Sequence, residues 1–203
     1  MSAFEPTITM SKAHLLRKCP RTGLLLVGSV VAVSASPDHS FSKLRQNTIR
    51  MVEGHGIEGD AHAGRYVRDR YLAKKQPRLP NLRQVHLMPI ELFEEVRTAG
   101  FDVNAGDLGE NVTTAGLEIT SFPLGTLLQL GKTAVIELTG LRTPCSLIDR
   151  FRKGLKKQML GGPETAKFKC GVLGIVLIGG QVFPNDVIKV VLPPEPWSIL
   201  PAL

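Results

Sequence analysis

Short runs rich in β-branched residues recur along this chain, and glycine and proline turns separate them. Such runs predict strands, and seven of them cover residues 47–52, 83–87, 116–119, 126–130, 133–139, 172–178 and 187–192. One helix is predicted over residues 89–98, because apolar residues recur there at helical spacing and Gly100 follows as a stop. Many short strands with few helices favour a mainly β fold, a closed or partly closed barrel.

The length of 203 residues and the hydrophobic content of 43% predict a single domain with a sizeable core. The apolar run 23–36 superficially resembles a secretory leader, but its position and glycines favour a first strand. We therefore expect a weakly ordered extension over residues 1–22 and one domain over residues 23–203. The odd number of cysteines, without a CxxC pair, fits a reducing compartment such as the cytoplasm; these are Cys19, Cys145 and Cys170.

A basic segment gives the chain much of its net charge of +7 and directs attention to an anionic partner. Its cationic residues are Arg65, Arg68, Arg70, Lys74, Lys75 and Arg78. Only Tyr66 and Tyr71 interleave with these charges, and no recognised nucleic-acid-binding motif is present. A solvated loop is the favoured interpretation, and neither a nucleic-acid nor a membrane partner is expected.

Cys145 lies where an apolar strand-like run ends and an amphipathic stretch begins. The sequence predicts a helix with Thr143 as its N-cap, Pro144 at the first helical position and Cys145 in the first turn. Unpaired backbone N–H groups and the helix dipole stabilise a thiolate in such a place, and Arg142 could add to the effect. A thiolate can attack an electrophile, carry sulfur or bind a soft metal. The alternative is a buried structural thiol.

Three polar segments fall in predicted turns or strand ends. Residues 54–64 place two histidines and two carboxylates among glycines, which allow the backbone to approach an anion closely. Residues 81–87 alternate, so that Gln84 and His86 share one face and Arg83 takes the other. Residues 106–114 form a turn rich in amides and hydroxyls.

Two interpretations of the glycine-rich segment remain open. Asp60 and His62 can organise the loop through hydrogen bonds, as aspartate does in turns. The other interpretation is a zinc site, although the spacing matches no specific zinc pattern; its ligands would be His55, Asp60, His62 and Cys145.

Taken in order, these segments resemble the MOSC family, named for the C-terminal part of molybdenum cofactor sulfurase. The segments that carry the resemblance are Gly59–Gly64, Asn81–His86, Gly106–Thr114 and Arg142–Cys145. Each piece alone is weak, but their combined order is specific. The resemblance runs from about Gly28 to Pro196 and implies a MOSC β-barrel, similar to the barrel domain of pyruvate kinase.

The resemblance also implies roles for individual residues. Cys145 falls on the family's characteristic cysteine, which binds or relays sulfur and coordinates molybdenum in the reductase members. Arg83 is suited to the phosphate of the molybdenum cofactor because a guanidinium gives bidentate hydrogen bonds, and Lys43 is a second phosphate candidate. The implied cofactor-binding set comprises Asn111, Thr143, Arg83, Gln84, His62 and Asp60.

The leading functional hypothesis is a standalone molybdenum cofactor protein that reduces N-hydroxylated compounds with electrons from a separate reductase. Cys145 would be the metal ligand, and His62 or His86 could supply a proton. The alternative is a non-catalytic sulfur carrier or cofactor-trafficking module that uses a Cys145 persulfide from a sulfur donor protein. A third hypothesis is a cysteine hydrolase that uses Cys145, a histidine and Asp60. No aminotransferase-like segment is recognised, so no pyridoxal phosphate site is expected.

Overall fold

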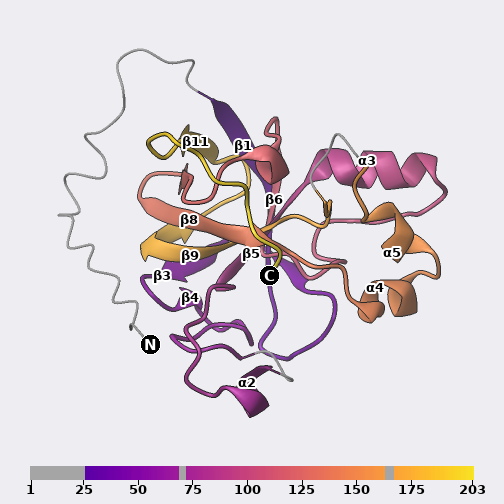
Figure 1. Cartoon of the computed structure of the whole chain (residues 1–203), viewed down its shortest axis with the longest axis horizontal. Coiled ribbons are helices and arrows are strands. Elements are labelled where there is room, and N and C mark those ends of the chain that lie inside the picture. The colour runs from indigo at the N-terminus through magenta and orange to yellow at the C-terminus, as the bar shows by residue number, and fades with distance from the viewer. Residues whose placement is uncertain (1–25, 69–71, 163–166) are drawn as a thin grey trace.

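Seven strands of this computed structural model, which describes residues 26–68, 72–162 and 167–203, close a barrel (Figure 1). Closure occurs because β1 pairs with β6 on one side and β11 on the other. β5 and β6 are parallel, whereas the other neighbouring strands are antiparallel. In order around the barrel the strands are β1 (Val27–Ala35), β11 (Val187–Val191), β7 (Leu127–Leu130), β8 (Ala134–Leu141), β9 (Val172–Ile178), β5 (Val85–Pro89) and β6 (Val112–Ala115).

Smaller elements surround this barrel. The strand β2 (Leu44–Gln46) pairs with β1, and a second sheet contains β10 (Gly180–Val182), β3 (Ile49–Val52) and β4 (Gly56–Ile57). The helices are α2 (Leu72–Lys75), α3 (Ile90–Thr98), α4 (Ser146–Phe151), α5 (Leu155–Gln158) and the 3₁₀ helix η1 (Ile119–Ser121). The predicted mainly β fold and the helix near 89–98 are confirmed, while the expected extension over 1–22 lies outside the described residues. No helix in the described ranges is long and apolar enough to cross a bilayer.

Alternation along the strands separates the barrel core from the outer face. Val85 and Leu87 of β5 are fully buried in the apolar cluster to which every barrel strand contributes. Met88 points the other way and joins a second cluster with Phe93 and Val96 of α3. His86 therefore lies on the outer face of the wall, opposite Val85 and Leu87.

The predicted strand over 116–119 is wrong. The strand at this place is β6, four residues earlier, and Gly116 follows it with a positive φ of 76°. That conformation ends the extended chain, and the backbone N–H of Gly116 donates a hydrogen bond to Glu91. The chain then enters η1, in which Ile119 is buried. The apolar residues of this segment thus pack in the core without forming a strand.

We expect Gly171→Ala to lower the free energy of unfolding by about 3 kcal/mol or more. Gly171 has a φ of 86°, and a methyl group there would clash with the carbonyl oxygen of Leu87. Gly54→Ala is the matched control, since Gly54 also has a positive φ but has open space around it. It should cost about 1 kcal/mol. Urea unfolding measures the free energy of unfolding of both variants. Equal losses in Gly171→Ala and Gly54→Ala would contradict the steric argument.

Candidate functional site

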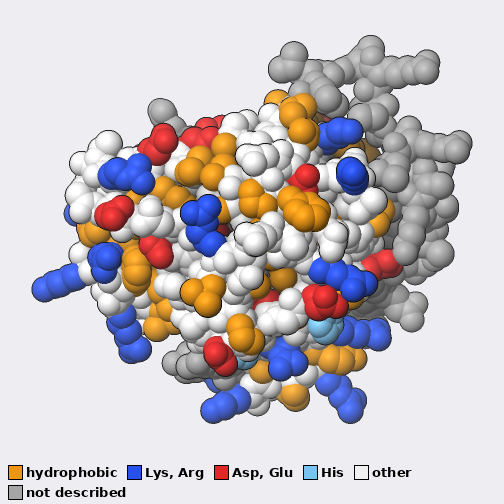
Figure 2. Space-filling model, turned by 180° about the vertical axis from the view of Figure 1, so that it is seen from behind, with side chains coloured by type: hydrophobic (Ala, Val, Ile, Leu, Met, Phe, Trp, Pro, Cys, Tyr) orange, Lys and Arg blue, Asp and Glu red, His pale blue; other side chains and the backbone are white. Residues whose placement is uncertain are grey.

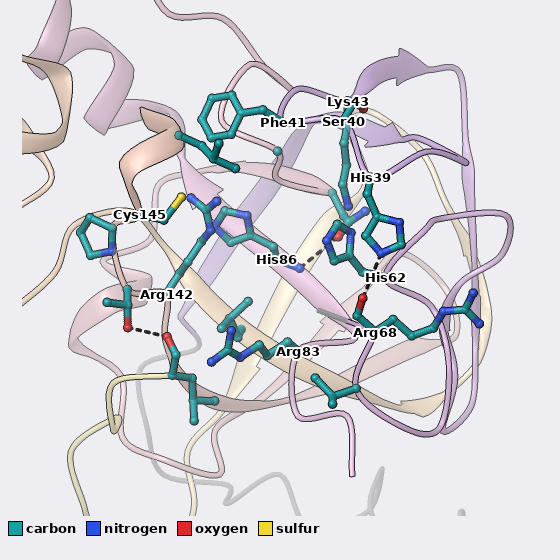
Figure 3. Close-up of a pocket in the computed structure, with 18 of the residues that line it drawn as sticks. His39, Ser40, Phe41, Lys43, His62, Arg68, Arg83, His86, Arg142 and Cys145 are labelled. Atoms are coloured by element: carbon teal, nitrogen blue, oxygen red, sulfur yellow. Dashed lines mark hydrogen bonds between the residues drawn. The ribbon is translucent and has the colours of Figure 1, made fainter. Parts of the chain in front are cut away.

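Five chain segments gather on the outer face of the barrel and enclose a pocket of about 490 Å³ (Figure 3). Residues 39–43 follow β1, and residues 62–68 follow β4. Residues 81–83 precede β5, residues 109–111 precede β6, and residues 142–150 follow β8. The pocket floor includes His86 of β5 and Leu173 of β9, which are opposite each other in the strand register.

Positive charge dominates the pocket. The cationic and imidazole side chains that line it are Lys43, Arg68, Arg83, Arg142, Arg150, His39, His62 and His86. No aspartate or glutamate is among the lining residues of the described chain. Cations around a concave site raise the local concentration of anions, so the pocket is suited to a ligand with phosphate or other anionic groups.

Asp60 organises the pocket from beneath. Its Oδ2 accepts a hydrogen bond from the amide of Asn111 at 3.1 Å and lies 2.7 Å from the Lys43 ammonium. Its Oδ1 accepts the backbone N–H of His62 at 2.9 Å, and the His62 ring nitrogen Nδ1 lies 3.4 Å away. One buried carboxylate therefore joins three loops that are distant in sequence.

The ion pair between Lys43 and Asp60 is almost fully buried, with side-chain exposures of 4% and 2%. Burial lowers the pKa of Lys43, although the Asp60 charge opposes that effect. Burial alone would raise the pKa of Asp60, but hydrogen bonds from His62 and Lys43 and the Lys43 charge hold it below its ordinary value. The carboxylate is thus charged at neutral pH and fixes the position of the Lys43 ammonium in the pocket wall.

Asn111 connects this ion pair to the pocket floor. Its amide nitrogen donates to Asp60 and to the backbone carbonyl of Ser34, and its amide oxygen accepts the backbone N–H of His86. These bonds use both ends of a side chain that is 2% exposed. Asn111 lines the pocket, where a residue of the expected cofactor-binding set should lie. Its side-chain amide also connects the loops around the pocket through these hydrogen bonds.

His86 is a buried, neutral imidazole. Its Nε2–H donates to the carbonyl of Cys170 at 2.8 Å, because a carbonyl oxygen can only accept. Burial, followed by the nearby Arg142 charge, lowers the pKa of His86 well below its ordinary value. The same Arg142 has a buried Nη1 without a hydrogen-bond partner in the described residues. An unpaired guanidinium nitrogen at the pocket wall favours an anionic ligand there.

His86 should make the folded protein sensitive to mild acid. The folded protein keeps the His86 imidazole neutral, whereas the unfolded chain binds a proton on it below the ordinary pKa of 6.5. The contribution of His86 to the free energy of unfolding is therefore present above pH 6.5 and is lost progressively as pH falls from there toward the lowered folded pKa. Below pH 6.5, unfolding free energy should fall by up to about 1.4 kcal/mol per pH unit relative to His86→Gln. Urea unfolding of both proteins between about pH 8 and pH 5 measures this difference. Parallel curves for wild type and His86→Gln would contradict the prediction.

Cys145 lies in the pocket wall, but not in the helical turn that the sequence predicts. The helix α4 begins at Ser146, so Cys145 occupies the preceding cap position with φ −102° and ψ 171°. Thr143 is not the N-cap, because its hydroxyl donates to the carbonyl of Leu203. The backbone of this segment stays extended while it pairs with residues 201–203. Figure 3 shows the Cys145 sulfur turned toward the side of the pocket that carries Arg142.

Cys170 has the surroundings of a structural thiol. It is fully buried in the cluster beneath α3, and its S–H donates to the carbonyl of Arg142. Burial raises the pKa of Cys170 to about 11. A thiol with that pKa is a poor nucleophile and metal ligand at neutral pH. Cys145, which lines the pocket and is half-buried, is the accessible thiol of the described chain.

The structure gathers most, but not all, of the expected site residues. His62, Arg83, Asn111, Thr143 and Cys145 line the pocket, and Asp60 lies directly behind it. Lys43, the second phosphate candidate, also lines the pocket. Gln84 does not: its side-chain oxygen accepts the backbone N–H of Val176 at 3.0 Å, which ties β5 to β9.

The zinc interpretation finds no support in the geometry. The described residues contain no cluster of three or more histidine, cysteine, aspartate or glutamate side chains that could hold a metal ion. His55 is exposed, and its carbonyl oxygen accepts the backbone N–H of Gly64. The alternative for this segment, loop organisation by Asp60 and His62, is the arrangement that the structure contains.

Sequence reasoning missed three contributors to the site. His39 and Arg150 also line the pocket. Glu110 lies fully buried behind it, where burial raises the pKa of its carboxyl group. Arg150 lies on the helix that the sequence predicts after Cys145, so its charge could have been assigned to the site from the sequence. Nothing in the sequence around Glu110 indicates that its side chain is buried.

Comparison with known families identifies the chain. The family model of the MOSC domain matches residues 74–189, more than half of the sequence. The chain belongs to the MOSC family. MOSC domains are linked to molybdenum cofactor binding. No curated protein matches this MOSC chain by sequence.

Solved structures show the same fold. The crystal structure of the YuaD protein from Bacillus subtilis is similar with a TM-score of 0.68 at 22% identity, covering 82% of this chain and 97% of that one. YiiM from Geobacillus stearothermophilus gives a TM-score of 0.58 at 19% identity, over 81% and 75% of the two chains. YiiM from Escherichia coli gives 0.56 at 19% identity, over 84% and 73%. At these identities the likeness establishes the MOSC barrel and leaves the chemistry to be argued from the pocket.

Proposed function

We propose that this MOSC protein binds the molybdenum cofactor beside Cys145 and reduces N-hydroxylated compounds. The observation that carries the proposal is a pocket that combines an accessible thiol with converging cations and has no aspartate or glutamate side chain among its described lining residues. Thiolate sulfur is a soft metal ligand, and guanidinium and ammonium groups bind phosphate. The donor set therefore fits both ends of a metal-bearing, phosphorylated pterin.

Individual residues fit the cofactor in different ways. The unpaired Nη1 of Arg142 offers a free hydrogen-bond donor at the wall, and Arg83 and Lys43 add further cations. Asp60 holds the Lys43 ammonium in place, so this donor is already oriented before a ligand arrives. Cys145 would hold the metal, and the three cations would hold the phosphate of the pterin.

The cofactor would supply two-electron redox chemistry, for which a separate reductase provides the electrons. Reduction of an N-hydroxylated compound to the corresponding amine and water consumes two electrons and two protons. His86 is poorly placed to donate a proton, because its N–H is engaged by the Cys170 carbonyl and its pKa is lowered by burial. His62, whose side chain is 42% exposed and oriented by Asp60, is the better proton carrier.

A sulfur carrier is the second candidate function. Its support is the position of Cys145, half-buried in the wall of an open pocket where a small donor can reach it. A persulfide on this thiol would lie close to the same cations. The hydrolase hypothesis is weaker, since no hydrogen bond joins Cys145 to His62 or His86 in the described chain, and that mechanism requires such a bond.

The test is to purify the full chain from cells that make molybdenum cofactor and from cells blocked in its synthesis. We expect about one molybdenum and one pterin per chain from the first source and none from the second. Reduced viologen and an amidoxime then provide electrons and an N-hydroxylated substrate for a turnover assay. Cofactor with turnover supports the reductase, and cofactor without turnover supports a cofactor-trafficking role. Folded protein without cofactor from the producing cells would refute the cofactor functions and favour the sulfur carrier.

A further inference from the structure

A second pocket adjoins the first and shares part of its wall. It has a volume of about 700 Å³ and lies between the loop after β4 and the helix α2. His39, Val67 and Arg68 line both pockets, so the two hollows are neighbours across one wall. The second pocket is formed largely by the basic segment, for which the cofactor proposal gives no role.

Cations and one aromatic ring characterise this second pocket. Arg65, Arg68 and Lys74 line it, and no aspartate or glutamate is among its described lining residues. Tyr66 also lines it, with 44% of the residue exposed and the Arg65 guanidinium carbon 5.9 Å from the ring centroid. Figure 2 shows Lys and Arg side chains projecting from the lower end of the molecule, where Figure 1 places α2.

This combination has a definite chemical preference. Arginine and lysine bind phosphate, whereas an exposed aromatic ring with an adjacent guanidinium binds the flat face of a base. A bare phosphate would use the cations and leave the ring unused. A group that carries both a phosphate and an aromatic base uses the whole pocket.

We propose that the second pocket binds a nucleoside monophosphate group, with its phosphate near Arg68 and Lys74 and its base against Tyr66. Two sources have this chemistry. One is a nucleotide attached through a pyrophosphate to the pterin in the first pocket, and this source depends on the proposed function. The other is a free nucleotide, which does not. Because Arg68 lines both pockets, the two sites are adjacent, as a ligand that spans both would require.

The experiment titrates the full chain, purified from cells blocked in molybdenum cofactor synthesis, with CMP, GMP and inorganic phosphate by calorimetry. We expect a nucleoside monophosphate to bind with a Kd below about 1 mM and phosphate at least about ten-fold more weakly. Tyr66→Ala should weaken nucleotide binding at least about ten-fold, and Lys74→Ala should weaken it and reduce its salt dependence. Lys189→Ala is the matched control, because Lys189 is an exposed lysine on β11, at the opposite end of the molecule in Figure 1.

Acid release of bound small molecules, followed by pyrophosphatase treatment and chromatography, distinguishes the sources. In protein from cofactor-producing cells, one released nucleotide per released pterin supports the attached form. Release of a pterin without a nucleotide, together with saturable binding of added nucleotide, supports the free form. Saturable nucleotide binding by a protein that releases no pterin would refute the proposed function and leave this site standing. Absence of both released nucleotide and saturable binding would overturn the site. Binding that is unchanged in Tyr66→Ala and Lys74→Ala would overturn it as well.

Discussion

Cys145→Ser should purify with almost no molybdenum, while the fold and the unfolding midpoint stay close to wild type. The serine hydroxyl is a harder donor than a thiolate and keeps its proton at neutral pH. Loss of an outer hydrogen-bond partner alone costs about 10–100-fold in metal affinity, so loss of the ligand itself should cost more. Cys145 is only half-buried, and the substitution should change stability by less than about 0.5 kcal/mol. Elemental analysis per folded chain measures the loss.

The matched control for this change is Cys170→Ser. Its hydroxyl can still donate to the Arg142 carbonyl in place of the thiol. We expect Cys170→Ser to keep molybdenum at the wild-type ratio in whatever fraction folds, because Cys170 is buried outside the pocket. If molybdenum survives in Cys145→Ser and is lost in Cys170→Ser, the assignment of the metal ligand is incorrect.

Asp60→Asn should be the most destabilising change at the polar site. It leaves the buried Lys43 ammonium without its counter-charge, and removal of one partner of a buried ion pair costs about 3–5 kcal/mol. The wild-type contribution is present above the ordinary carboxyl pKa of 3.8 and is lost as pH falls through the lowered folded value. Urea unfolding at about pH 7 measures the loss of unfolding free energy in Asp60→Asn. The cofactor content of the folded fraction of this variant should also fall.

A surface ion pair provides the control for Asp60→Asn. Arg50 and Glu58 lie 3.6 Å apart, with side-chain exposures of 64% and 60%. Glu58→Gln should therefore cost less than about 1 kcal/mol. Combining Asp60→Asn with Lys43→Met removes the buried charge and should recover part of the lost stability. An Asp60→Asn loss no larger than that of Glu58→Gln would show that the buried pair does not organise the loops.

The barrel and the accessible cysteine are the features that local sequence patterns predict well. β-branched runs such as 134–139 carry their own strand signal, and the helix near 89–98 has apolar spacing and a glycine stop. The order of polar segments places Asn111, Arg83 and Cys145 in one pocket without any knowledge of distances. These features depend on short-range residue choice, which one sequence records directly.

Long-range contacts account for most of what the sequence does not predict. Thr143 has the residue type of a helix cap, but residues 201–203 draw its segment into extended pairing. The strand β1 has a register shift between Val30 and Ala32, which interrupts the alternation of a regular strand. Asp60 meets Lys43 only after the barrel brings their loops together. No local signal specifies partners that are so distant along the chain.

Closure of the barrel also sets the order in which the site can be completed during synthesis. β11 supplies the strand between β1 and β7, and Leu203 lines the pocket and accepts the Thr143 hydroxyl. A nascent chain that still has these residues inside the ribosome has neither a closed barrel nor a finished pocket wall. Any ligand that needs the whole pocket must therefore enter after translation has passed residue 203.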